Sequence, residues 1–358
     1  AVNENDLMFP LTFGARGSAT IGCVLSTNAG GSNVLKYGNT RDLVLGVEMV
    51  LPNGDIMNLM SELHKDNSGY CLRDLVIGAE GTLGIITQAV LKLFPKPKAH
   101  ATAMVAVKSL DHALALLNEL QEGTGGAVAA YEYMPKRYIQ GYMELSSSSR
   151  KPFQKDYDHL VMIELETTVE LFSRSTDDGQ VLLSGELERI LNKNLVDGSI
   201  LDAHIAQNEE QRLIMWERRE AAAEISLLKK PLINNDIAVP LEKISEFLTI
   251  MEKKLPELDP EADVLIVSHL GDGNVHYTVW PSLDDEKHKD KIMEAIENVV
   301  LLLGGSFSAE HGIGISKLSS MERRKDSVAL KVMRQIKDAI DPKGIMNPGK
   351  VLPREYDS

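Results

Sequence analysis

The chain has 358 residues, 43% of them hydrophobic and 25% charged, as in ordinary folded proteins and unlike disordered or fibrous chains. This length predicts two domains. Lys and Arg number 38 against 52 Asp and Glu, a formal net charge of -14, which argues against nucleic acid as a partner. No apolar run reaches the roughly 18 to 20 residues that span a bilayer, so no transmembrane segment is expected.

The two cysteines, Cys23 and Cys71, are too few for a disulfide framework and lack C-x-x-C spacing. This favours a reducing compartment. The first residues lack the basic and apolar regions of a signal peptide. We therefore expect a cytoplasmic protein, or a mitochondrial one if the source is eukaryotic. The chain lacks an initiator Met, which suggests a processed or trimmed product.

Residues 1–98 are expected to form short strands and glycine-rich loops. Apolar runs at 43–51 and 85–93 are typical of strands, and a turn sequence at 52–54 follows the first. The proline-rich segment 95–100 ends this region, so we place a domain boundary near residue 98.

From residue 101 the pattern alternates between strands and helices, which predicts an α+β domain over 99–340 with one sheet covered by helices. Strands are expected at 101–107, 127–133, 159–164, 233–239, 264–267 and 275–280. Helices are expected at 110–120, 179–193, 207–229, 240–254, 283–302 and 321–340. Residues 341–358 are expected to be a loop-like segment that returns to the first domain.

The strongest motif is SHLGDGNVHYTVW at 268–280. Two apolar runs flank a turn sequence, which predicts a hairpin that brings His269 and His276 close together. Two neighbouring imidazoles suit a divalent metal of the zinc type. Two surface histidines beside an ordinary turn would give the same pattern.

A second motif is FSAEHGIG at 307–314, in which Glu310 and His311 precede two glycines. Neighbours in an extended chain point to opposite faces, so one of the two is expected to complete a two-His, one-carboxylate metal site and the other to act as acid or base. An imidazole suits proton transfer, whereas a carboxylate is a harder oxygen ligand. A solvated Glu-His pair at a strand end is the alternative.

Two weaker signals concern ligand binding. The glycines at 78, 81 and 84 let a planar or phosphorylated ligand approach the backbone, but the same spacing serves any tight turn. No Walker A or G-x-G-x-x-G sequence is present, which disfavours a nicotinamide domain. Arg219 and Arg218 lie on an expected helix, where either could bind a carboxylate or simply be solvated.

Six motifs, taken in order, resemble the FAD-linked oxidase family of the vanillyl-alcohol oxidase fold. They are TIGCVLSTNAGG (20–31), YGNTRDLVLGVEMVLPNGDI (37–56), KDNSGYCLRDLVIGAEGTLGIIT (65–87), SHLGDGNVH (268–276), AEHGIG (309–314) and DPKGIMNPGK (341–350). The branch is similar to D-2-hydroxyglutarate and D-lactate dehydrogenases and the glycolate oxidase D subunit. The resemblance implies the second part of an FAD domain over 1–98, a substrate or cap domain with an antiparallel sheet over 99–340, and a C-terminal segment that returns to the flavin.

The resemblance also implies roles for individual residues. The metal ligands would be His269, His276 and Glu310, and the catalytic base His311. Arg219 would hold the substrate carboxylate, and Asn274 would be a neighbour of substrate or metal. The residues that would line the flavin are Thr20, Gly22, Asn28, Gly30, Gly31, Gly78, Glu80, Gly81, Ile85 and Asn347.

Three departures from the family pattern matter. Family members carry a preceding first FAD subdomain, and this chain begins after it, so the flavin site is expected to be incomplete. Ala223 and Asn234 stand where 2-hydroxyglutarate dehydrogenases place a Thr and a Lys, which removes the cation for a distal carboxylate and leaves lactate-like acids open. Cys23 replaces the second glycine of a T-I-G-G motif.

The sequence therefore predicts an FAD-dependent enzyme that oxidises a D-2-hydroxy acid, lactate-like or 2-hydroxyglutarate-like, to the 2-oxo acid. A divalent metal would act as Lewis acid on the substrate while hydride moves to flavin N5. An electron-transfer flavoprotein or a quinone is the expected electron acceptor, and a homodimer is compatible with the sequence. Two rivals are a metal-dependent hydrolase and a non-catalytic or truncated subunit.

Overall fold

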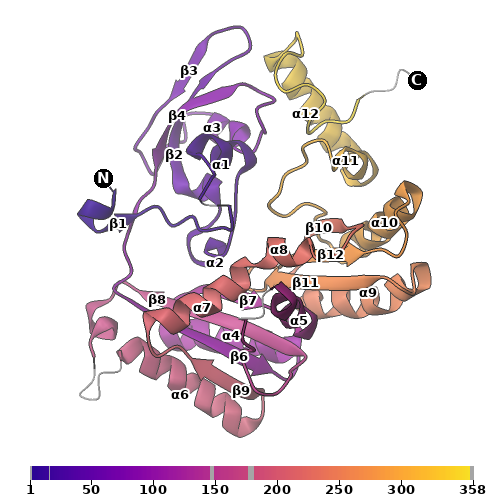
Figure 1. Ribbon diagram of the computed structural model, residues 1–358. Helices are drawn as coiled ribbons and strands as arrows, with labels where there is room; N and C mark the ends of the chain where they lie inside the picture. The colour runs from indigo at the N-terminus through magenta and orange to yellow at the C-terminus, as the bar shows by residue number, and fades with distance from the viewer. Residues whose placement is uncertain (1, 16, 146–148, 176–180, 355–358) are drawn as a thin grey trace. The chain divides into compact units, whose positions relative to one another are not determined.

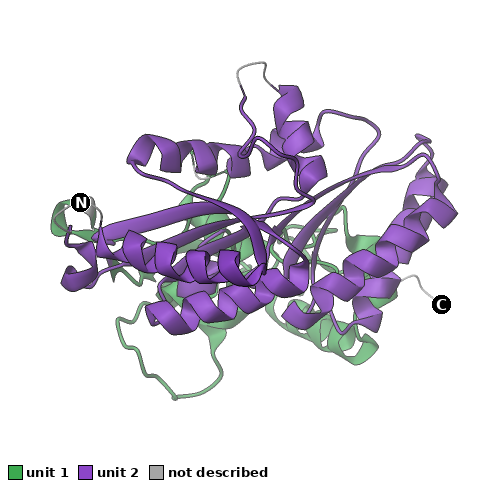
Figure 2. Cartoon of the chain, turned by 90° about the horizontal axis from the view of Figure 1, so that it is seen from below, with its two compact units in different colours: residues 1–31, 37–94, 307–358 green, residues 32–36, 95–306 purple. Residues whose placement is uncertain are grey.

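The computed structural model describes residues 2–15, 17–145, 149–175 and 181–354, and within it the chain forms two compact units. Unit 1 comprises residues 1–31, 37–94 and 307–358, and unit 2 comprises 32–36 and 95–306 (Figure 2). Residues 179–180 of one expected helix and 355–358 of the expected C-terminal segment lie outside the described residues. The sequence assigned 307–340 to the second domain, whereas contacts group these residues with unit 1.

Unit 1 is built on a three-stranded antiparallel sheet in the order β3-β2-β4. Its strands and helices are β2 (Val44–Val50), β3 (Ile56–Leu59), β4 (Ile85–Leu91), α1 (Ile21–Thr27), α3 (Leu72–Val76), α11 (Leu318–Arg324) and α12 (Ser327–Ile340). Strands β2 and β4 lie where the sequence predicted them. Residues Ile336 and Ile340 of α12 pack against the apolar cluster of this sheet, which explains why the end of the chain belongs to unit 1.

Helix α1 falls where the sequence predicted only strands and loops. The Thr20 side chain accepts a hydrogen bond from the backbone N–H of Cys23 and so caps the first turn. Asn28 ends the helix in the left-handed conformation, with φ of 49°. The helix has only seven residues, too few for a clear 3.6-residue apolar period, so its caps were the one available signal.

Unit 2 contains a seven-stranded sheet in the order β10-β12-β11-β7-β8-β6-β9, and every neighbouring pair is antiparallel (Figure 1). The strands are β6 (Ala99–Val107), β7 (Val128–Tyr133), β8 (His159–Thr167), β9 (Ile200–Ile205), β10 (Ile233–Ala238), β11 (Asp263–His269) and β12 (Asn274–Trp280). The α+β prediction of an antiparallel sheet covered by helices is confirmed.

Helices cover both faces of this sheet, because successive side chains of a strand point to opposite sides. In β6, Val105 contributes to the apolar core under α4 (Leu110–Thr124), α6 (Leu182–Asp197), α9 (Ile244–Leu258) and α10 (Glu286–Leu302). Its neighbour Met104 belongs to the core under α5 (Lys136–Leu145), α7 (Glu209–Glu220) and α8 (Ala222–Ser226). The sequence missed α5 and β9.

Two long helices expected from the sequence are each divided in the structure. The helix expected at 207–229 is α7 followed by α8, which are divided at Ala221, and α8 ends at Ser226. The helix expected at 321–340 is α11 followed by α12, because the Asp326 side chain accepts a hydrogen bond from the backbone N–H of Ala329 and starts a new helix.

The remaining short elements are β1 (Leu7–Met8), β5 (Phe94–Pro95) and α2 (Val34–Tyr37). Four 3₁₀ turns occur at Val2–Asn5, Thr40–Leu43, Glu170–Ser173 and Leu241–Lys243. Within the described ranges, no helix has the length and apolar character needed to cross a membrane.

Candidate functional site

The hairpin of β11 and β12 carries the two histidines singled out from the sequence. His269 pairs with Asn274 and Val267 pairs with His276, so both imidazoles project from the same face of the sheet. Their ring centroids lie 5.4 Å apart with an interplanar angle of 76°. The predicted hairpin and the predicted proximity of the two rings are therefore both present within unit 2.

His269 belongs to a buried charged cluster that the sequence analysis did not foresee. The Glu132 side chain at the end of β7 is fully buried, and its Oε1 lies 2.8 Å from His269 Nδ1. Arg219 of α7 donates from Nε to Glu132 Oε2. Burial alone raises the pKa of Glu132, but the Arg219 guanidinium and the His269 ring outweigh it and lower the pKa to about 2.

The sequence did contain one signal for Glu132. It is the only charged side chain in the run AVAAYEY at 127–133, which otherwise reads as a buried strand. A carboxylate in such a strand needs a cationic or hydrogen-bonding partner, because an unpaired buried charge is costly. The partner could not be named from the sequence.

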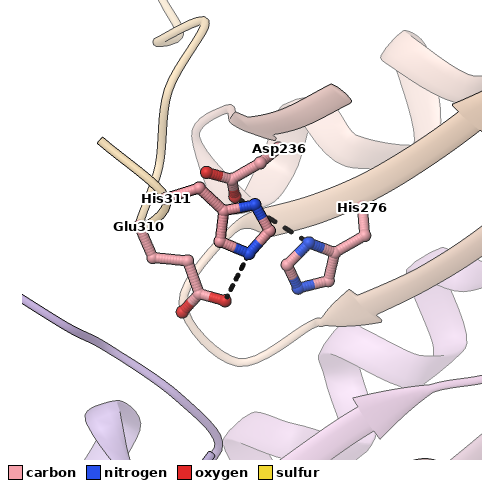
Figure 3. A group of neighbouring side chains, drawn as sticks. All are labelled: Asp236, His276, Glu310 and His311. Atoms are coloured by element: carbon pink, nitrogen blue, oxygen red, sulfur yellow. Dashed lines mark ion pairs between the residues drawn. The ribbon is translucent and has the colours of Figure 1, made fainter. Parts of the chain in front are cut away.

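Asp236 and Asn274 form a second buried pair beside His276. Asp236 Oδ1 lies 3.8 Å from His276 Nδ1 (Figure 3). The same oxygen accepts a hydrogen bond of 2.9 Å from Asn274 Nδ2. Asn274 Nδ2 also donates to the carbonyl of Ile237. The other amide atom, Asn274 Oδ1, is buried and has no hydrogen-bond partner among the described residues. A buried acceptor of this kind is suited to a donor group of a ligand or to a cation.

Arg219, rather than Arg218, joins this cluster. Arg218 donates from Nη2 to the carbonyl of Arg150 and lies over the ring of Tyr142, with its guanidinium carbon 5.5 Å from the centroid. Burial lowers the pKa of Arg218. The two arginines are equivalent by sequence position, and the direction of each side chain from α7 separates them.

Glu310 and His311 lie in unit 1, on the loop before α11. His311 Nε2 and Glu310 Oε1 are 3.7 Å apart (Figure 3), and His311 is exposed. The carboxylate of Glu80 fixes the backbone that follows: its two oxygens accept hydrogen bonds of 2.8 Å from the N–H groups of Ile313 and Gly314.

The residues predicted to line a flavin all lie in unit 1. The carbonyl of Glu80 accepts a hydrogen bond from Asn347 Nδ2, and the backbone N–H of Gly78 donates to the last turn of α1. The structure thus brings the glycine ladder, the end of α1 and Asn347 together. Thr20 and Asn28 serve as the caps of α1, and Gly31 approaches the backbone of Thr12 too closely for a side chain.

The surface of α1 and β4 leaves room for a flat apolar ligand. Ile21 and Ile85 are 45% and 55% exposed, and a Cβ on Gly22 would meet no atom within 4 Å. Exposed apolar side chains beside an open glycine are compatible with a planar ring against the backbone. These residues fit the flavin that the resemblance implies.

The two substituted positions lie in unit 2. Ala223 is exposed, and Asn234 Oδ1 accepts a hydrogen bond of 2.9 Å from Thr278 Oγ1. Neither side chain supplies a positive charge.

Comparison with known proteins agrees with this architecture. Residues 96–351 match the family described as "FAD linked oxidases, C-terminal domain", and residues 1–60 match an FAD binding domain. The chain is 33% identical over 356 residues to the mitochondrial D-2-hydroxyglutarate dehydrogenase of Arabidopsis thaliana, covering 98% of this chain and 61% of the relative. It is 31% identical over 359 residues to the D-2-hydroxyglutarate dehydrogenase of Xanthomonas citri, covering 98% and 72%.

Solved structures share the fold at lower identity. An alkyldihydroxyacetonephosphate synthase superposes with a TM-score of 0.64 at 17% identity, covering 97% of this chain and 61% of that one. The chain belongs to the FAD-linked oxidase family, as its motifs indicated. It spans less than two thirds of the Arabidopsis relative's length.

Proposed function

We propose that this protein is an FAD-dependent dehydrogenase that oxidises a small D-2-hydroxy acid to the corresponding 2-oxo acid. One observation carries the proposal: unit 2 places a guanidinium, two imidazoles and a buried amide oxygen at one end of one sheet, from Arg219, the β11–β12 hairpin and Asn274. The family match and the names of the relatives support the same chemistry.

These side chains suit a substrate with a carboxylate beside a hydroxyl group. Arg219 would bind the carboxylate, since a guanidinium offers several donors in one plane. Asn274 Oδ1 would face the substrate or the cation as a buried acceptor. Because Glu132 already neutralises part of the Arg219 charge, the cluster would bind a single carboxylate without a large excess of positive charge.

A divalent cation, with zinc favoured, fits the donors present. His269 and His276 would bind it with Glu310. Asp236, whose Oδ1 lies 3.8 Å from His276 Nδ1, is a further oxygen donor in unit 2. Such a cation lowers the pKa of a hydroxyl that it contacts. His311 would accept the hydroxyl proton, which suits an exposed imidazole.

FAD supplies the two-electron chemistry when bound, since none of the side chains can accept hydride. The residues proposed to line it are Thr20, Gly22, Asn28, Gly30, Gly31, Gly78, Glu80, Gly81, Ile85 and Asn347. An electron-transfer flavoprotein or a quinone would reoxidise it. We expect the protein in the cytoplasm, or in the mitochondrion of a eukaryote, as the names of the eukaryotic relatives indicate for those proteins.

The substrate is proposed to carry a short side chain. Ala223 and Asn234 provide no cation for a second carboxylate, so D-lactate and similar acids should be preferred over D-2-hydroxyglutarate.

The test is the visible spectrum of the FAD-loaded protein under anaerobic conditions, with matched D- and L-2-hydroxy acids. We expect a D-acid to bleach the flavin band and its L-enantiomer to leave it unchanged. Dialysis against a chelator should slow the bleaching, and zinc, cobalt or manganese should restore it. Failure of every D-acid in the metal-loaded protein would refute the proposal.

The proposed base has a matched control in the same unit. His311→Ala should slow bleaching by about 100-fold or more, because a positioned general base contributes about that much. His64→Ala removes another exposed imidazole of unit 1 that has no place in the site and should bleach at the normal rate. Equal rates in the two variants would refute the assignment of His311. Metal-dependent ester hydrolysis without flavin would instead support a hydrolase.

A further inference from the structure

The charged cluster of unit 2 contains one contact that the proposed function does not use, between Glu132 and His269. Glu132 lies between His269, a proposed metal ligand, and Arg219, the proposed carboxylate-binding residue. Its side chain is 1% exposed, and the three residues come from β7, β11 and α7. A single carboxylate therefore contacts two groups that would act on different parts of the substrate site.

The hydrogen bonds fix which nitrogen of His269 carries the proton. Glu132 Oε2 accepts from Arg219 Nε, so the carboxylate is held ionised by a guanidinium and offers only acceptors. Its Oε1, 2.8 Å from His269 Nδ1, then requires that Nδ1 carry the hydrogen.

Arg219 does not lie on the lone-pair axis of Nε2. Its Nη2 is 3.3 Å from Nε2 and 3.4 Å from Nδ1 of His269. A donor on that axis would be much farther from Nδ1 than from Nε2, so the nearly equal distances place the guanidinium nitrogen beside the ring. The direction in which Nε2 would bind a cation is therefore not the direction in which Arg219 sits.

We infer that Glu132 is a positioning residue that holds His269 in the Nδ1–H tautomer, so that Nε2 is the atom presented to a divalent cation, and that it fixes the guanidinium of Arg219 beside that ring. The inference rests on the proposed function for its metal. A carboxylate that accepts from the far nitrogen of a metal-binding histidine sets the tautomer and the ring orientation, and its loss lowers metal affinity.

A neighbouring ion pair, between Glu164 and Arg212, also holds α7 to the sheet and therefore provides a control for that function of Glu132. Glu164 of β8 is buried and accepts hydrogen bonds from Arg212 Nε and Nη2 and from Trp216 Nε1. Glu164 pairs with Ala130 across the sheet, so it projects from the same face as Glu132 and holds the first half of α7 to that face. Its other polar neighbours are Thr102 and His100 of β6.

The decisive variant is Glu132→Gln. A glutamine offers one acceptor oxygen, for which Arg219 Nε and His269 Nδ1 compete, and the charged guanidinium should win. The amide NH₂ then faces Nδ1 and favours the tautomer with hydrogen on Nε2, which removes the lone pair that a metal needs. Glu164→Gln is the matched control, because it weakens the docking of α7 without touching His269.

Two measurements test the inference. The first is ¹⁵N NMR of the histidine rings in the metal-free protein, with His269 assigned by loss of its signal in His269→Gln. We expect the Nδ1–H tautomer in the unmodified protein and in Glu164→Gln, and the Nε2–H tautomer in Glu132→Gln. The second is zinc affinity by chelator competition, in which Kd should rise roughly 10- to 100-fold for Glu132→Gln and remain unchanged for Glu164→Gln.

Each outcome decides the question. An Nε2–H tautomer in the unmodified protein, or equal losses of zinc affinity in the two variants, overturns the inference. If the unmodified protein binds no divalent cation, the metal of the proposed function is wrong, and the tautomer measurement still stands by itself. If Glu132→Gln does not fold, Glu132→Asp keeps two acceptors and should retain the Nδ1–H tautomer with partly restored zinc affinity.

Discussion

The loop that carries Glu310 and His311 should depend on a single carboxylate for its local stability. Glu80 accepts two backbone hydrogen bonds from this loop, and a Cβ on Gly312 would lie 2.7 Å from Glu80 Oε1, so the fit is close. In Glu80→Gln one of the two acceptors becomes an NH₂ group that faces a backbone N–H. The variant therefore loses one charge-assisted bond and gains a repulsive contact.

The expected loss of local stability follows from the energy of the Glu80 hydrogen bonds. A hydrogen bond to a charged group contributes about 1.5 to 3 kcal/mol, and the partial exposure of Glu80 places the loss near the lower end. A loss of about 1.5 to 2 kcal/mol corresponds to roughly 10- to 30-fold faster opening of the loop, since about 1.4 kcal/mol is a tenfold change. The effect should be local, because this loop lies outside the helices and strands of unit 1.

Amide hydrogen exchange measured by mass spectrometry resolves this change. Peptides covering 307–317 should exchange roughly 10- to 30-fold faster in Glu80→Gln, whereas the fluorescence unfolding midpoint should not move, because both tryptophans lie in unit 2. Glu48→Gln is the control: Glu48 accepts side-chain hydrogen bonds from Thr87 and Gln88 of β4, and its loss should leave the loop unchanged. Unchanged exchange in Glu80→Gln would refute the reasoning.

Two further predictions concern unit 2. Burial raises the pKa of Asp259, but hydrogen bonds from His288 and from the backbone of Ser282 lower it from 3.8 to about 2. The ionised carboxylate therefore contributes about 2 kcal/mol to the free energy of unfolding above pH 4, and this contribution is lost as the pH falls towards 2. Urea unfolding should show the deficit of Asp259→Asn shrinking over that range, and a constant deficit would contradict this. Gly273→Ala should destabilise unit 2 by at least about 2 kcal/mol. The φ of Gly273 is +84°, and the new Cβ would lie 2.3 Å from the Val239 carbonyl oxygen. An unchanged unfolding midpoint would count against the hairpin geometry.

The sequence predicted those structural features whose determining residues lie close together in the chain. The β11–β12 hairpin needs only a turn sequence and two apolar runs, and these lie within 268–280. The alternation of strands and helices after residue 101 predicted the covered sheet for the same reason. The six motifs indicated the family without any tertiary information.

Elements whose identity depends on distant partners were missed or misplaced. Helix α12 is amphipathic in sequence, but no local pattern states which core it covers, and Ile336 packs on unit 1 rather than on the sheet that precedes it. Helix α1 is too short for a period to show and is defined by its caps.

The sequence alone determined the candidate residues: two histidines on one hairpin, a Glu-His pair before two glycines, and an arginine on a helix. Only the tertiary structure decided that Glu132 joins Arg219 to His269, across sequence separations of 87 and 137 residues. The physical reason is that a buried carboxylate must be paired, while the sequence does not say with what. Its partners are set by which strands and helices pack together, and that is a property of the fold.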